Sequence, residues 1–182
     1  RMLETVRAYA IEKLVQAGDE AGTRARHVVH VLALAEAAWD AVGGPEQGPH
    51  IQRLDIEREN LLAAHAWCGQ AAECGEQGLQ LIYLLRTYWI IRGLLGLGHR
   101  VTVESLARPA ALARSAARSR LLVDAGQLSL FMGRHAEACQ YLEESRAIAD
   151  EIGDRRRLAA ALLPLGQVYG NLGQHDRARQ VH

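Results

Sequence analysis

The second half of the chain repeats itself with a period of forty residues. Gly93, Gly133 and Gly173 are forty residues apart. Similar side chains recur at fixed distances before and after each glycine: Ile82, Leu122 and Leu162; Leu85, Ala125 and Leu165; Trp89, Ser129 and Tyr169; Gly98, Ala138 and Ala178. Such self-similarity is typical of helical solenoids, whose units bury their apolar faces against their neighbours. The repeat predicts an all-α superhelix of antiparallel helical hairpins, right-handed, that offers a long binding surface rather than a catalytic pocket.

Each repeat is predicted to be a helix, a short turn and a second helix. The expected helices cover residues 79–92 and 98–107, then 115–132 and 135–152, then 154–172 and 175 onward. The glycine of each turn supplies the left-handed backbone conformation that ends many helices. Small residues at Gly126, Gly166, Ala138 and Ala178 allow the two helices of a unit to approach closely.

The first half lacks this period but is also predicted to be helical. Apolar spacing predicts helices over residues 2–17, from a cap at Thr23 to residue 42, and from Ile51 to a point before Gly75. Glycine and proline predict a loop over residues 43–49. We therefore divide the chain into an N-terminal helical region, 1–77, and a repeat region, 78–182, whose last unit is truncated.

Composition narrows the possible functions. The 21 basic and 21 acidic residues give no net charge, so nucleic-acid contacts are not expected. The arginine runs at 114–120 and 155–157 are interpreted as solvated surface. Three cysteines, an odd number without a CxxC motif, favour a reducing, cytoplasmic compartment. No stretch is long and apolar enough to predict a membrane helix.

Catalytic patterns are not apparent in the sequence. We find no paired carboxylates, no Ser/His/Asp set and no phosphate-binding loop, so neither an enzyme nor a cofactor is predicted. A helical metal-binding protein that uses His27, His30 and Glu36 is kept as an alternative. Zinc sites need three or four ligands, and no third ligand is convincingly spaced.

The segment from Leu162 to Ala178 resembles a tetratricopeptide repeat. It reads LLPLGQVYGNLGQHDRA, with Leu165, Gly166, Tyr169 and Ala178 at the spacing of that family. The unit around Leu122 keeps most of the pattern, whereas the unit around Ile82 has Arg86 where Gly126 and Gly166 stand. The resemblance implies a superhelix of hairpins over residues 79–182, with looser packing in the first unit.

A second resemblance covers the N-terminal half. The segments RMLETVRAYA at 1–10 and RLDIERENLLAA at 53–64, followed by Trp67, are similar to a junction in large bacterial regulators. These regulators are STAND-class signal-transduction ATPases, including LuxR-type and antibiotic-regulatory activators. The resemblance implies that a nucleotide-binding domain and a winged-helix segment precede this chain, which looks like a fragment cut at both ends.

The family further implies a binding groove lined by the first helix of each unit. The residues that map to this groove are Tyr83, Thr87, Ile90, Arg120, Asp124, Gln127, Phe131, Leu163, Gln167 and Asn171. A protein or peptide, or the rest of the parent chain, is the expected partner, and the open repeat end could pair two copies.

From these observations we predict the sensor and protein-interaction region of a bacterial transcriptional regulator. The alternative is a free-standing tetratricopeptide adaptor that binds peptides or helices.

Overall fold

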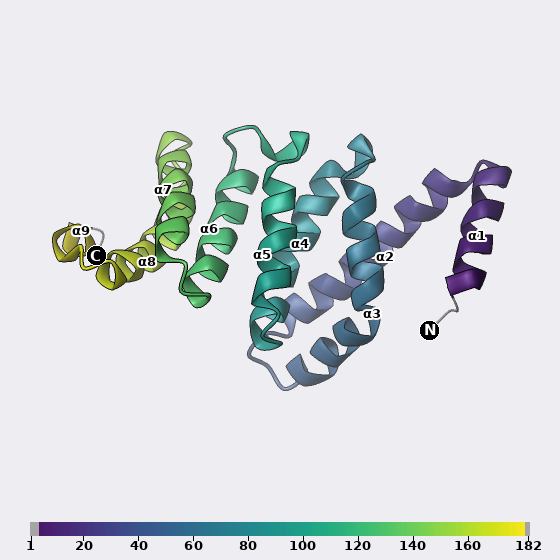
Figure 1. The fold of residues 1–182 in the computed structure, drawn as a ribbon, viewed down its shortest axis with the longest axis horizontal. Coiled ribbons are helices and arrows are strands. Elements are labelled where there is room, and N and C mark those ends of the chain that lie inside the picture. The colour runs from purple at the N-terminus through teal and green to yellow at the C-terminus, as the bar shows by residue number, and fades with distance from the viewer. Residues whose placement is uncertain (1–3, 181–182) are drawn as a thin grey trace.

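The chain folds into a row of helices that follow one another in space in chain order (Figure 1). The computed structural model describes residues 4–180, and within them it contains no strand. The α-helices are α1 (Glu4–Ala17), α2 (Glu20–Asp40), α3 (Gln47–Cys68), α4 (Gly75–Ile91), α5 (Leu95–Leu106), α6 (Ala116–Phe131), α7 (His135–Glu151), α8 (Arg155–Asn171) and α9 (His175–Gln180). Two short 3-10 turns lie at Ala72–Cys74 and Pro109–Ala111. The all-α fold of tetratricopeptide-like hairpins is thereby confirmed.

The three repeats are the hairpins α4–α5, α6–α7 and α8–α9, as predicted, but α4 begins at Gly75 and α5 at Leu95, earlier than the expected residues 79 and 98. Their turn glycines, Gly93, Gly133 and Gly173, have φ angles of 66°, 74° and 71°. In each turn the amide after the glycine donates to a carbonyl five residues earlier, for example Arg134 to Ser129 at 2.9 Å. A side chain at these positions would strain the left-handed backbone, which explains why glycine recurs there.

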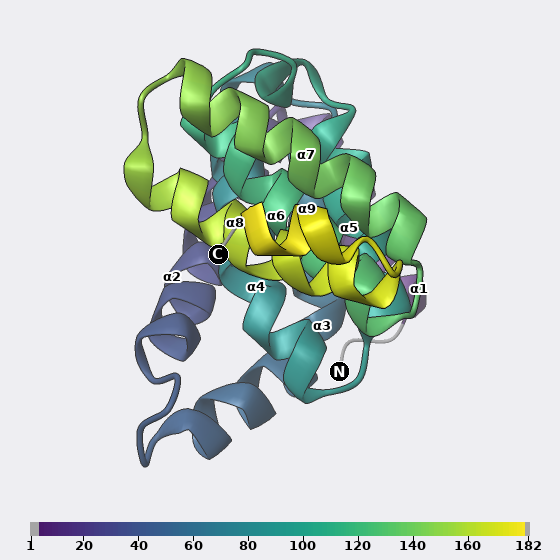
Figure 2. The same ribbon diagram turned by 90° about the vertical axis from the view of Figure 1, so that its left-hand side faces the viewer.

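Small residues let the two helices of a hairpin pack closely. A Cβ atom added to Gly126 of α6 would lie 2.6 Å from Cγ of Leu142 on α7. A Cβ atom added to Gly98 of α5 would lie 2.7 Å from Cγ of Trp89 on α4. Figure 2 looks along the row from the α8–α9 end, with the earlier hairpins stacked behind. The first helices α4, α6 and α8 contact each other between units.

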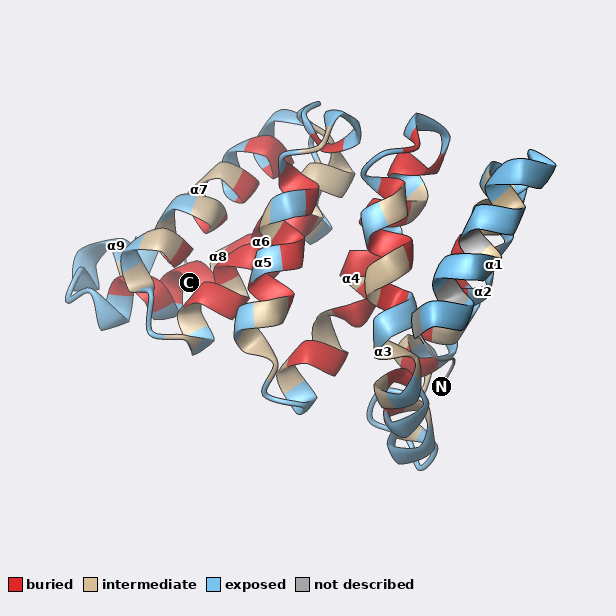
Figure 3. Cartoon of the chain, turned by 45° about the vertical axis from the view of Figure 1, so that its right-hand side comes forward, coloured by how far each residue is buried: buried red, intermediate tan, exposed pale blue. Residues whose placement is uncertain are grey.

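The main core continues across the two regions of the chain. One cluster of buried apolar side chains extends from Val28 on α2 to Ile148 on α7, and a second joins α6, α7 and α8 around Leu165. Helix α4 carries many of these side chains, including the fully buried Trp89 and Tyr88 (Figure 3). The nearly all-round apolar character of α4 follows because α2, α3, α5 and α6 of the same chain cover it.

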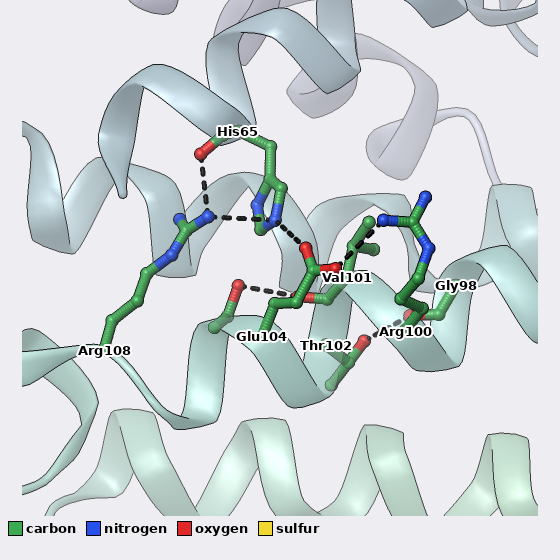
Figure 4. A network of polar contacts seen from close by, with 8 residues as sticks. His65, Gly98, Arg100, Val101, Thr102, Glu104 and Arg108 are labelled. Atoms are coloured by element: carbon green, nitrogen blue, oxygen red, sulfur yellow. Dashed lines mark hydrogen bonds and ion pairs between the residues drawn. The ribbon is translucent and has the colours of Figure 1, made fainter. Parts of the chain in front are cut away.

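A buried histidine joins α3 to the end of α5 (Figure 4). Arg108 donates from Nη2 to Nε2 of His65 at 2.9 Å and to the His65 carbonyl at 2.8 Å. Glu104 lies 3.2 Å from the same ring nitrogen and also accepts from Arg100. Burial, followed by the charge of Arg108, lowers the pKa of His65 to about 4. The ring is therefore neutral at pH 7, and its Nε2 accepts from Arg108 in one tautomer or donates to Glu104 in the other.

Two expectations for the N-terminal half were wrong in detail. Helix α2 begins at Glu20, three residues before Thr23, and the Thr23 hydroxyl donates to Asp19 instead of capping the helix. Helix α3 begins at Gln47, so Pro49 lies within its first turn, where a missing N–H costs no helical hydrogen bond. The expected start of the first helix at Met2 lies outside the described residues.

Helix α1 is largely uncovered. It packs against α2 at one end of the row, and Val6, Tyr9 and Val15 are 48%, 61% and 55% exposed.

Candidate binding site

A two-part cleft lies along the first helices of the three hairpins. Its larger part, which we call the apolar chamber, has a volume of about 660 Å³. Its smaller part, the arginine chamber, has a volume of about 290 Å³. Tyr83 of α4 and Arg120 of α6 line both chambers, so they form the boundary between them.

The two chambers differ in their chemistry. The apolar chamber is lined by Leu79, Leu84, Leu121, Ala110, Ala113, Ala116 and Ala117, with Glu76, Gln80 and Ser115 as its other polar residues. The arginine chamber is lined by Arg86, Arg156, Arg157, Asp124, Ser119, Val123 and Ala160. With Arg120, four arginines and one carboxylate line the arginine chamber, and Arg156 among them is exposed to solvent.

Contacts between units fix the positions of these arginines. The guanidinium of Arg120 lies over the ring of Tyr83, 4.3 Å from its centroid. Arg86 donates from Nη1 to Oδ1 of Asp124 and to Oε1 of Gln127, each at 3.2 Å. Its guanidinium also lies 5.6 Å from the ring centroid of Trp39 on α2. The site therefore depends on how α2, α4 and α6 pack together.

Helix α8 supplies the far wall of the arginine chamber. Asp154 caps α8 by accepting from the backbone N–H of Arg157 at 3.0 Å. The same aspartate lies 3.4 Å from Nε of the Arg157 side chain. Burial, followed by the nearby charge of Arg120, lowers the pKa of Arg157. The arginines of α6 and α8 thus face each other in a shielded space.

Asp124 is the one carboxylate inside the chamber. Its side chain is 2% exposed, and its Oδ2 atom has no hydrogen-bond partner among the described residues. Burial raises the pKa of Asp124 to about 7, against the opposing effect of Arg86, Arg120 and Arg157. Near neutral pH this group can therefore take up or release a proton when the charge around it changes.

The structure brings part of the predicted groove together. Tyr83, Arg120 and Asp124 line the cleft, and Gln127 is joined to them through Arg86. The remaining predicted residues, half-buried or exposed, line neither chamber: Thr87, Ile90, Phe131, Leu163, Gln167 and Asn171.

The interpretation of the arginine runs as solvated surface was wrong for several members. Arg118 is partly buried and bonds Glu144 and two backbone carbonyls. Arg120 and Arg157 line the cleft, as does Arg86, which the sequence marked only as a departure from the repeat. The missed signal was spacing: Tyr83, Arg120 and Arg157 are separated by 37 residues each, and bonded Arg86 and Asp124 by 38. Contacts between first helices of successive units are expected near the repeat period.

Other chemistry finds little support. Within residues 4–180, no group of three or more His, Cys, Asp and Glu side chains could hold a metal ion. In the metal-binding alternative, Glu36 instead accepts from Gln80 at 2.9 Å, and His30 is exposed. The three cysteines are free thiols, and Cys68 and Cys74 are buried. No helix in the described part is long and apolar enough to span a bilayer.

Comparison with known proteins agrees with this helical-repeat class. Residues 117–182 match the tetratricopeptide repeat family. Two curated relatives are Mb0914c of Mycobacterium bovis and Rv0890c of Mycobacterium tuberculosis, each named "Putative HTH-type transcriptional regulator". Each is 34% identical over 176 aligned residues, which cover 91% of this chain. The chain spans only 19% of the length of either relative.

Proposed function

We propose that this chain is the sensor and protein-interaction region of a bacterial STAND-class ATPase, of the LuxR-related type, that regulates transcription. The observation that carries the proposal is the alignment with much longer proteins that are named as HTH-type transcriptional regulators. ATP hydrolysis and DNA binding are assigned to other parts of the parent protein. The region described acts in the cytoplasm and performs no catalysis.

The proposed mechanism is a change in how the repeat array holds its neighbours. Tetratricopeptide repeats in general bind other proteins, and stacked hairpins offer a long surface for this purpose. A partner or effector that occupies the surface of α4, α6 and α8 would favour one arrangement of the array over another. Val6 and Tyr9, exposed and three residues apart on α1, are apolar side chains that preceding parts of the parent protein could cover.

We assign partner contacts to the exposed part of the same surface. Phe131 is 55% exposed at the end of α6, and Gln167 and Asn171 are exposed along α8. An exposed aromatic side chain on α6 and exposed polar side chains on the neighbouring α8 suit a peptide or a helix. The α9 end of the array is the surface through which two copies could pair.

The test begins with the coding sequence on both sides of this chain. We expect an upstream phosphate-binding loop, GxxxxGK[ST], and a helix-turn-helix segment in the same protein. In that full-length protein, Phe131→Ala with Gln167→Ala should abolish regulated transcription, whereas Gln140→Ala, exposed on α7, should not. Unchanged regulation in the double variant would show that the assigned surface does not bind the partner.

A free-standing adaptor is the second candidate. It would be supported by a start codon just before Arg1 and a stop codon soon after His182, and that outcome would overturn the regulator proposal. The search would then turn to peptides that bind the same helices.

A further inference from the structure

We infer that the cleft binds a small amphiphilic organic anion, whose charged headgroup enters the arginine chamber and whose apolar body fills the apolar chamber. The inference deepens the proposed function, on which it rests, because it names the chemical class of the effector. It also extends the site to Arg86, Arg156 and Arg157, which were not among the predicted groove residues.

We infer the negative charge of the ligand's headgroup from the excess of arginines in the arginine chamber. Arg86, Arg120 and Arg157 surround the buried carboxylate of Asp124, Arg156 lines the same chamber, and Asp154 pairs with Arg157. The Nε atoms of Arg86 and Arg120 are buried and have no hydrogen-bond partner among residues 4–180, whereas Nε of Arg157 lies 3.4 Å from Asp154. Buried donors without partners are costly, so a ligand that accepts from them would gain that free energy. Carboxylate, sulfate and phosphate groups all present several acceptor oxygens to guanidinium groups.

We infer the apolar body of the ligand from the lining of the adjoining apolar chamber. Leucine and alanine side chains from α4, α6 and the connecting segment 110–117 form most of its lining. Tyr83 and Arg120 line both spaces, so a single molecule can extend from one chamber into the other. A molecule with a headgroup alone would leave the apolar chamber to water, and a neutral apolar molecule would leave the arginines unpaired.

The dimensions favour a small molecule. Volumes of about 660 and 290 Å³ lie in the range of pockets that enclose small ligands. The contact of Arg120 with the Tyr83 ring also holds that guanidinium in place. A fixed guanidinium loses little side-chain freedom on binding, and this favours a compact ligand over a flexible chain.

Asp124 adds a dependence on protons. It is faced by Arg86 of α4, Arg120 on its own helix, and Arg157 of α8, which also pairs with Asp154; Arg156 lines the same chamber. An anion bound beside this carboxylate repels its negative form and favours uptake of a proton. Binding should therefore strengthen as the pH falls from 8 to 6.

The experiment is calorimetric titration of this chain with octyl sulfate and with octanoate, whose charges stay fixed between pH 6 and 8. The matched probes are 1-octanol, which lacks the charge, and inorganic sulfate, which lacks the body. Octyl sulfate or octanoate should bind at one site, and the preferred headgroup will be the one that binds more tightly. Both matched probes should bind more weakly, and equal binding of 1-octanol would overturn the inference.

Variants separate the cleft from general adsorption of a surfactant. Arg120→Gln and Arg157→Gln should each weaken binding about tenfold or more, because each removes charge-assisted hydrogen bonds. Arg146→Gln, an exposed arginine of α7, should change binding by less than about twofold. Asp124→Asn should strengthen binding and remove its pH dependence. Equal losses in the Arg120, Arg157 and Arg146 variants would refute a specific site, and circular dichroism checks that each variant folds.

The same anion could belong to a membrane lipid, and vesicles test this source. The free molecule is the form we propose, so the chain should not sediment with phosphatidylglycerol vesicles. Sedimentation that is lost in Arg120→Gln would assign the cleft to lipid instead.

The two proposals can fail separately. If neither probe binds but an upstream phosphate-binding loop exists, this inference fails and the regulator stands. If a probe binds but no such loop exists, the cleft stands and the regulator fails.

Discussion

Replacing Gly98 with alanine tests whether the contact between α4 and α5 leaves room for a single methyl group. The added Cβ atom would lie 2.7, 2.8 and 2.8 Å from Cγ, Cβ and Cδ1 of Trp89. Trp89 is fully buried, and two of these atoms lie near its backbone, so the side chain cannot move aside without shifting α4. Overpacking of a core costs about 1–3 kcal/mol, and we place this site at about 3.

The helical preference of alanine offsets part of this cost. Alanine is favoured over glycine by about 1 kcal/mol inside a helix, so the expected net loss is about 2 kcal/mol. For a chain of this size, that corresponds to a fall in Tm of about 4–8 °C. Urea unfolding followed by circular dichroism should show a lower midpoint with an unchanged slope.

Gly96→Ala is the matched control on the same helix. A Cβ atom at Gly96 meets nothing within 4 Å, so this variant should gain up to about 1 kcal/mol. If Gly98→Ala proved as stable as Gly96→Ala, the packing argument would be wrong. A further check is the background Trp89→Ser, which mimics the Ser129–Ala138 pair of the next unit. In the Trp89→Ser background, Gly98→Ala should cause little further loss of unfolding free energy. Trp89→Ser by itself should lose about 3–5 kcal/mol.

Three further predictions concern buried polar groups. Because the pKa of His65 is about 4 when folded and 6.5 otherwise, the folded state binds fewer protons, and its stabilisation falls as the pH decreases from 6.5 toward 4. At pH 5 the native chain should have lost about 2 kcal/mol of unfolding free energy through this group. Urea unfolding at pH 7 and at pH 5 measures the loss, and His65→Gln should remove it. The raised pKa of Asp124 has the opposite effect: its contribution to stability is present at low pH and is lost as the pH rises from 3.8 to about 7. Asp124→Asn should therefore become more stable relative to the native chain as the pH rises across that range. The hydroxyls of Ser119 and Ser145 lie 2.9 Å apart in the core. Each single alanine variant should lose about 1 kcal/mol of unfolding free energy. The double variant should lose less than the sum of the two, which a double-mutant cycle measures.

The sequence was sufficient for the hairpins because each one is specified locally. Glycine at the turn, apolar residues before it and a small residue after it lie within about twenty residues, so one unit predicts its own shape. The pair Trp89 and Gly98 illustrates this: a larger aromatic residue on one helix is matched by the smallest residue on the other. The N-terminal boundaries were less accurate because Asp19 precedes α2 without a side-chain cap hydrogen bond and Pro49 lies inside the first turn of α3, where a loop was expected.

The arginine chamber could not be predicted in the same way, because its contacts join different units. Arg86 stands where other units have glycine, and the sequence alone suggested loose packing there. Its partners are Asp124 and Gln127 of the next unit, so the departure in one repeat is matched in another. Once the period is known, pairs separated by 37–41 residues become testable contacts, and the same search would apply to further units.

Overall neutrality conceals how differently the arginines are used. Arg118 is satisfied by Glu144 and by two carbonyls, and Arg114 pairs with Glu151 at 2.6 Å, so these residues hold hairpins together. The arginines of the cleft have Asp124 and Asp154 as acidic partners, and Nε of Arg86 and of Arg120 has no partner among the described residues. Stability alone would favour pairing or removing such groups, since buried charges without partners are costly. This local excess of positive charge beside an apolar space is better explained by a ligand that supplies the missing acceptors.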